Sequence, residues 1–237
     1  MKFLKSTIIT LSLLLASVVA HAQSSQSTLL PSSTLAPFTS IKVDGEIELT
    51  LVKGGRDNLY KIEYDVRDNE ANKFKFSTKS SGELVISLSS NVRSIDKVRA
   101  TIYYDKIERL VASFAQVEFA TPFEASIVDI ELNNAATIKG QIECDDLDLT
   151  LISESRAELN GSSKYLTLRA QSNSKAELRQ LNITSARITT SQSSVVALTA
   201  GERLDVGAAT KSVVKYWGEP KILRLRSSLI GGEVVRQ

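Results

Sequence analysis

A short pattern of a small residue, any residue and a large residue recurs along the chain between Val117 and Gly218. Successive triplets begin 19, 21, 19, 20 and 18 residues apart, at 117–119, 136–138, 157–159, 176–178, 196–198 and 214–216. A fixed period of about 20 residues built from short alternating runs is typical of a solenoid. The sequence therefore predicts an all-β fold, a parallel β-helix in which each repeat forms one coil.

The positions within each repeat predict what lies inside the coil. Side chains alternate along a strand, so the first and third residues of a triplet share a face, and we expect Ala136, Ala157 and Ala176 to stack inside. Gly140 and Gly161, like Gly218, close coils at turns that often need positive φ. A polar residue precedes five triplets by two positions, where the strand is expected to bend and the side chain to bind backbone groups or neighbours: Asn134, Ser155, Ser174, Ser194 and Ser212.

Residues 38–108 alternate in longer runs than the later coils. Asp44-Gly45 lies between two such runs, which is typical of a β-hairpin. The end of a solenoid exposes apolar side chains and unpaired strand edges. We therefore expect residues 38–108 to form an antiparallel β unit that caps the coils of residues 109–237.

The first 22 residues resemble a secretory signal peptide. A basic start is followed by an apolar run over 8–19 and by Ala20-His21-Ala22, a small-x-small cleavage pattern. The alternative, a membrane anchor, would need about 20 apolar residues, and no later stretch is long enough either. Residues 23–37 are rich in Ser, Thr and Pro and predict a flexible leader. We expect export to the periplasm, the outer cell surface or the medium, without lipid attachment, because Cys144 lies far from the cleavage site.

Charge and composition exclude several functions. Lys2 and Lys5 are 2 of the 29 basic residues and leave with the signal peptide, so 27 remain against 27 acidic residues. A neutral chain has no electrostatic basis for binding nucleic acid. Cys144 is the only cysteine, so no intramolecular disulfide can form, and His21, the only histidine, lies in the signal peptide. Histidine-dependent hydrolysis, zinc sites and most transition-metal sites are excluded for lack of side chains, and no cofactor is expected.

Carboxylates are the remaining candidates for chemistry. Asp146 and Asp148 share a strand face, and their oxygens are ligands that calcium accepts. Calcium needs six or more oxygen ligands, so a solvated turn is the favoured interpretation of this acidic cluster.

A second acidic pair lies on the predicted outer face. Stacked coils would place Glu158 and Glu177 about 5 Å apart, the spacing of neighbouring strands, which is also that of the carboxylates in retaining glycosidases. Lys139 and Arg179 fall in the adjacent outward row and could neutralise them. Charge pairing between strands of a solvated sheet is the favoured explanation.

Four aromatic side chains could serve as platforms for sugars: Tyr103, Tyr104, Tyr216 and Trp217. Packing at the ends of the solenoid is the favoured role.

Several motifs together resemble a known family. They are Phe38-x-x-Ile41-x-Val43-x-Gly45, Gly82-x-Leu84-x-Ile86 and Ile107-x-x-Leu110, which lead into coils rich in Ala and Ser. In this respect residues 38 to 220 are similar to the head GIN domain family, secreted proteins of Bacteroidetes-type bacteria named as auto-transporter adhesin heads. The resemblance implies a right-handed β-helix in the cell envelope or outside the cell, and it provides no catalytic residues.

We therefore expect a non-catalytic protein whose surface binds a glycan or an envelope protein, since solenoids form extended binding surfaces. Two alternatives stay open. One is a carbohydrate-active β-helix enzyme that cleaves an acidic polysaccharide with Glu158 or Glu177, and the other is a purely structural envelope protein. The sequence leaves the oligomeric state open.

Overall fold

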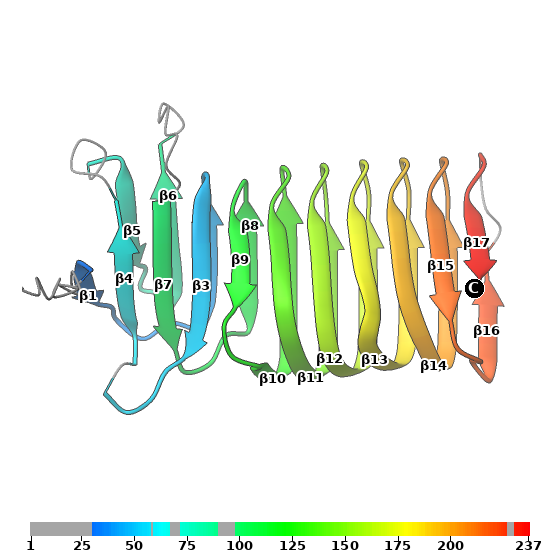
Figure 1. Cartoon of the computed structure of the whole chain (residues 1–237), viewed down its shortest axis with the longest axis horizontal. Coiled ribbons are helices and arrows are strands. Elements are labelled where there is room, and N and C mark those ends of the chain that lie inside the picture. Colours follow the sequence, from blue (N-terminus) through cyan, green and yellow to red (C-terminus); the bar gives the residue numbers. More distant parts are fainter. Residues whose placement is uncertain (1–29, 58, 67–71, 90–97, 227–229) are drawn as a thin grey trace, which may run out of the picture.

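The computed structural model describes residues 30–57, 59–66, 72–89, 98–226 and 230–237, so the predicted signal peptide of residues 1–22 lies outside it. In these ranges every regular element is a strand, from β1 to β17. The strands wind into one β-solenoid whose coils follow each other along the long axis of the molecule (Figure 1). The predicted all-β solenoid is confirmed. No helix in the described ranges is long and apolar enough to cross a membrane.

Four long strands form the central coils: β11 (Thr137–Leu151), β12 (Arg156–Ala170), β13 (Lys175–Thr190) and β14 (Val195–Ala208). Each pairs in parallel with the next. The start of β11 pairs with β9 (Gln116–Phe119), and the remainder pairs with β10 (Phe123–Asn133). Each coil thus has a first side, a broad turn through which the strand stays paired, and a second side. A tight turn then leads into the next coil.

The tight turns contain two consecutive residues in the left-handed conformation, and neither is glycine. They are Asn134–Ala135, Ser153–Glu154, Ser172–Asn173, Gln192–Ser193 and Thr210–Lys211. A left-handed non-glycine residue costs about 1–2 kcal/mol. Hydrogen bonds between stacked turns offset this cost, for example from the Ala135 amide to the Ser153 carbonyl (2.7 Å) and from the Glu154 amide to the Ser172 carbonyl (2.8 Å).

Glycines stand where the broad turns begin in two of the coils. Gly140 and Gly161 have φ of 137° and 107°, and Gly218 has φ of 97°, as predicted. A Cβ atom on Gly140 would lie 2.7 Å from the Cβ of Phe119, and one on Gly161 would overlap the carbonyl oxygen of Ile142. The turn therefore needs glycine for both its backbone angle and its closeness to the preceding coil.

The register of the first coils differs from the prediction by two residues. Ile138 pairs with Ala157, so Ala136 lies over Ser155 and the predicted stack of Ala136 on Ala157 is wrong. Ala157 does pair with Ala176. A slip of two residues leaves every side chain on its own face. Matching triplets by residue size therefore could not detect it.

The predicted polar column at the bend exists, with one change of membership. Ser155, Ser174, Ser194 and Ser212 are fully buried beside the tight turns. Their hydroxyls bind turn backbone and one another, as when the Ser174 hydroxyl donates to the Gln171 carbonyl at 2.7 Å. Asn134 does not belong to this column, because it is exposed in the tight turn itself.

The N-terminal region contributes coils of its own, in an order that differs from the chain order. β2 (Ser40–Asp44) pairs in parallel with both β6 (Glu83–Leu88) and β8 (Arg109–Ser113). β3 (Ile47–Lys53) pairs in parallel with both β7 (Val98–Tyr104) and β9. The coil of β2 and β3 is thus inserted between two later coils (Figure 1). The hairpin predicted at Asp44-Gly45 is wrong, since β2 and β3 take successive sides of one coil.

An antiparallel cap is present but smaller than predicted. β4 (Lys61–Asp65) pairs antiparallel with β7, β5 (Phe74–Thr78) with β6, and β1 (Ser32–Thr34) with β4. Aromatic rings of Tyr64, Phe74 and Phe76 pack together there, with centroids 5.4–5.7 Å apart. β1 lies within residues 23–37, so the expected flexible leader is wrong for that strand.

Three short strands form the opposite end. β15 (Val213–Trp217) pairs with β14, β16 (Ile222–Leu225) with β14, and β17 (Glu233–Arg236) with β15, all in parallel. The core is one continuous cluster of buried apolar side chains, mostly aliphatic, from the cap to these strands.

Candidate functional site: a groove along the broad turns

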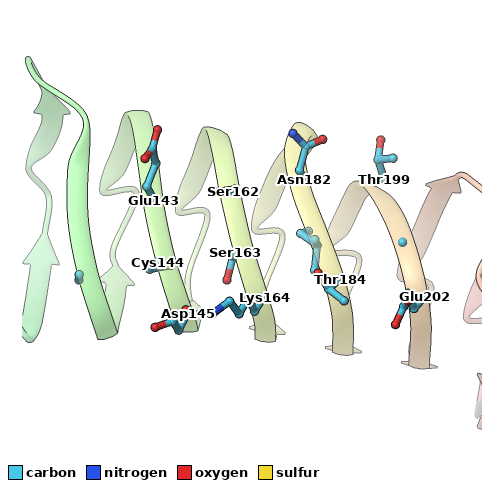
Figure 2. A pocket seen from close by; sticks show the side chains of 13 residues that line it. Glu143, Cys144, Asp145, Ser162, Ser163, Lys164, Asn182, Thr184, Thr199 and Glu202 are labelled. Carbon is cyan, nitrogen blue, oxygen red and sulfur yellow. Dashed lines mark ion pairs between the residues drawn. The ribbon is translucent and has the colours of Figure 1, made fainter.

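A groove of about 620 Å³ runs across strands β10 to β14, along the broad turns of the coils. Figure 2 shows its side chains arranged along the solenoid axis. Its floor follows one position of the coil through Ala125, Cys144, Ser163 and Ile183, which are register partners in successive coils. In the last coil the floor residue is Gly201, which comes directly after Ala200, the register partner of Ile183.

The groove exists because most of its floor residues are small. Ala125 pairs with Cys144, and Cys144 pairs with Ser163 in the next coil. Further along, Gly201 approaches so closely that a Cβ atom there would lie 2.6 Å from the Ile183 carbonyl oxygen. Short side chains at one coil position thus leave a channel between the longer side chains on either side.

Polar side chains form both flanks of this channel. One flank consists of Glu143, Ser162, Asn182 and Thr199, and the other of Asp145, Lys164, Thr184 and Glu202 (Figure 2). Ion pairs join Lys164 to Asp145 (2.6 Å) and Lys221 to Glu202 (3.2 Å). The charged lining residues are three carboxylates and one ammonium, so the groove disfavours acidic ligands.

The two nucleophile-type side chains of the floor lack what catalysis would need. Burial raises the pKa of the Cys144 thiol, so it stays protonated at neutral pH. The Ser163 hydroxyl is buried and donates to the Tyr165 carbonyl at 2.9 Å. No described histidine is available as a base, because His21 is the only one in the chain. Neither Cys144 nor Ser163 is therefore an activated nucleophile in this groove.

An exposed aromatic ring follows directly on one flank residue. Tyr165 comes after Lys164 and exposes 56% of its surface. The sequence does not predict this exposure, because strict alternation would expose only one of these two neighbours. At the broad turn the alternation breaks, and both are exposed.

The predicted acidic pair lies on the first side, outside this groove. Glu158 and Glu177 are register partners in neighbouring coils and line a smaller hollow of about 400 Å³. Arg179 forms an ion pair with Glu177 at 2.6 Å. Lys139 lies in the same row as Glu158, not in the adjacent one as predicted, and pairs with Glu118 at 3.1 Å.

The aspartates considered for calcium lie on the second side. Asp148 accepts a hydrogen bond from Arg169 at 2.9 Å, and Asp146 is the register partner of Tyr165. No group of three or more His, Cys, Asp or Glu in the described part of the chain is arranged to hold a metal ion.

The four aromatic residues singled out from the sequence do not form a platform. Tyr104 and Tyr216 are buried. The Tyr103 hydroxyl donates to Glu63 at 3.2 Å, and the Arg179 guanidinium lies over the Trp217 ring, 5.3 Å from its centroid.

The chain is thus a parallel β-solenoid with an antiparallel cap and a polar groove along its broad turns. The family model described as "Putative auto-transporter adhesin, head GIN domain" matches residues 37–220. The chain belongs to this head GIN domain family, which confirms the resemblance seen in the sequence.

Solved structures share the fold at low sequence identity. A "putative adhesin" from Bacteroides fragilis is 17% identical, with a TM-score of 0.77 over 87% of this chain and 95% of that chain. A "putative adhesin" from Parabacteroides distasonis is 14% identical, with a TM-score of 0.64 over 86% and 95%. A "putative lipid binding protein" from the same species is 12% identical, with a TM-score of 0.65 over 88% and 96%. No curated protein matches the chain.

Proposed function

We propose that this chain is an exported, non-catalytic binding protein that holds a neutral, extended glycan along the groove of the broad turns. The observation that carries the proposal is the groove itself, which repeats its polar flanks from coil to coil. Neighbouring coils are spaced by about 4.8 Å, the separation of paired strands. An extended sugar chain advances by a similar distance per residue, so successive sugars can meet equivalent hydroxyl, amide and carboxylate groups.

The lining chemistry selects the class of ligand. Ser162, Asn182 and Thr184 offer the donors and acceptors that sugar hydroxyls bind. Excess carboxylates oppose an acidic polysaccharide, and the polar flanks favour a glycan over the lipid named for one structural relative. Tyr165 supplies an exposed ring on which a sugar face can stack.

The enzyme alternative has weaker support. Arg179 forms an ion pair with Glu177, and the hollow beside it, about 400 Å³, is smaller than the groove of about 620 Å³.

The proposal is tested by screening the purified protein against neutral and acidic linear glycans, with a parallel assay for released reducing ends. We expect binding to neutral glycans and no release. Asn182→Trp fills the groove from an exposed position and should weaken binding about tenfold or more, a loss typical of a blocked contact. Thr189→Trp, exposed on the second side of the same strand, is the matched control and should bind normally.

Three results would contradict the proposal. They are release of reducing ends, unchanged binding by Asn182→Trp, and binding to no glycan at all. The last would favour a purely structural role in the envelope.

A further inference from the structure

The terminal coil has two free strand edges. β16 pairs with β14 and β17 pairs with β15, and no described strand pairs with the outer edge of either. The amides of Arg226 and Glu233 donate back into the solenoid, to Val206 (2.8 Å) and Ser212 (2.9 Å). Backbone groups alternate between the two edges of a strand. The N–H and C=O groups of Leu223, Leu225, Val234 and Arg236 therefore point away from the solenoid.

Core side chains are uncovered at the same place. Leu225 continues the interior column above Val206, and Leu223 continues the column above Leu204. Val206 and Leu204 are fully buried, whereas Leu225 and Leu223 expose 57% and 41% of their surface. At the opposite end, β4 and β5 cover the comparable surface with aromatic rings. An open edge with an exposed apolar core is a site for adding further strands.

We propose that a second copy of this chain covers the terminal coil, with β17 of each copy pairing antiparallel with β16 of the other. A twofold axis parallel to the strands brings the two ends together and makes both pairings equivalent. Backbone groups that point outward must face each other, so Val234 lies opposite Leu225 of the second copy. The apolar side chains of Val234 and Leu225 then join the core of one copy to the core of the other.

Charge favours pairing of β17 with β16 of the second copy over pairing of β16 with itself. Antiparallel pairing of β17 with β16 brings Glu233 against Arg226 of the second copy, with Arg224 on the diagonal. Glu233 has no ion-pair partner among the described residues, and neither has Arg224. Pairing β16 with itself would instead bring Arg224 and Arg226 against their own copies, and like charges across strands are destabilising.

The arrangement has a consequence for the groove. An axis parallel to the strands leaves the broad turns of both copies along the same edge. The dimer would present two grooves in line, and linked sites strengthen binding to one polymer without any new contact. The pairing itself does not depend on the ligand.

The test is sedimentation of the purified protein over a wide concentration series. Two strand edges form a small interface, so we expect a dimer that dissociates on dilution. Leu225→Arg places a charge between the paired strands of the two copies and should leave only monomer. Because Leu225 is exposed, the variant should melt like the original protein by circular dichroism. Ile127→Arg changes an exposed apolar residue on β10 and should not alter dimerisation.

A charge exchange separates this pairing from other end contacts. Glu233→Arg should weaken the dimer about tenfold, and adding Arg224→Glu in the same chain should restore it in part. A monomer at every concentration would overturn the proposal. So would a Leu225→Arg variant that dimerises normally, or a charge exchange without effect.

Discussion

Ser155 and Ser174 lie on one another in successive coils, with their hydroxyl oxygens 3.3 Å apart in the fully buried interior. The backbone amide of Ser174 in turn donates to the hydroxyl of Ser194 at 3.2 Å. A line of hydroxyls thus follows the solenoid axis beside the tight turns. It binds backbone groups that the turns cannot pair by themselves.

Ser174→Ala should lower the free energy of unfolding by about 1–2 kcal/mol, because the Gln171 carbonyl and the Ser155 hydroxyl both lose a hydrogen bond to the Ser174 hydroxyl. Alanine fits the space, since Ala136 occupies the equivalent position in the first of these coils. Chemical denaturation measures the change. Ser77→Ala, on the exposed face of β5, serves as the control and should be neutral. Equal stability of the two variants would contradict a structural role for the hydroxyl column.

Gly161→Ala should destabilise the protein by about 2–4 kcal/mol, because the added methyl group meets the Ile142 carbonyl and the backbone has φ of 107°. Thermal and chemical denaturation would measure the loss. Gly55→Ala adds the same methyl group where no atom lies within 4 Å, and it should leave stability nearly unchanged. A tolerated Gly161→Ala would mean that the broad turn can relax.

Tyr104→Phe should stabilise the protein by about 1 kcal/mol at pH 7, because the buried Tyr104 hydroxyl has no hydrogen-bond partner among the described residues. Burial also raises the pKa of Tyr104 to about 12, from an ordinary value of 10.0. Above pH 10 the unfolded chain releases this proton first, so the stability of the original protein falls as pH rises toward 12.

Denaturation of both proteins at pH 7 and pH 11 tests this. The advantage of the phenylalanine variant should be larger at pH 11. A loss of stability on removing the hydroxyl would show that it has a partner.

Asp205→Asn should lower stability at pH 7 by about 1–2 kcal/mol, because it removes the negative charge that Arg226 contacts at 2.9 Å. That hydrogen bond lowers the pKa of the nearly buried Asp205 carboxyl. The stabilisation is therefore complete above the carboxyl's ordinary pKa and is lost as pH falls through the lowered one. Unfolding measured from pH 7 downward should show the two proteins converging in acid. Asp57→Asn, at an exposed carboxylate, should show no such difference.

Arg179→Ala should shift the fluorescence of Trp217 to longer wavelength, because the guanidinium that covers the ring is removed and water reaches it. Trp217 is the only tryptophan in the chain, so the emission reports this site alone. Arg169→Ala, which removes a guanidinium on the second side, should leave the spectrum unchanged. An unshifted spectrum in Arg179→Ala would place the ring outside the reach of Arg179.

The sequence by itself determined the coil. Three features are local: the 20-residue period, the buried serines and the glycines of the broad turns. Each depends on the backbone conformation or the burial at its own position. The same information predicted that Ala157 and Ala176 stack, which they do.

Only the tertiary structure decided which coils touch. Ala136 lies over Ser155, because a two-residue slip preserves every face, and pairing of backbone groups across coils selects between such registers. The insertion of β2 and β3 between later coils likewise joins segments far apart in the sequence. The groove depends on the register as well, since Cys144 and Ser163 leave a channel only when they are stacked. Contacts of this kind are set by the whole fold, and no local pattern encodes them.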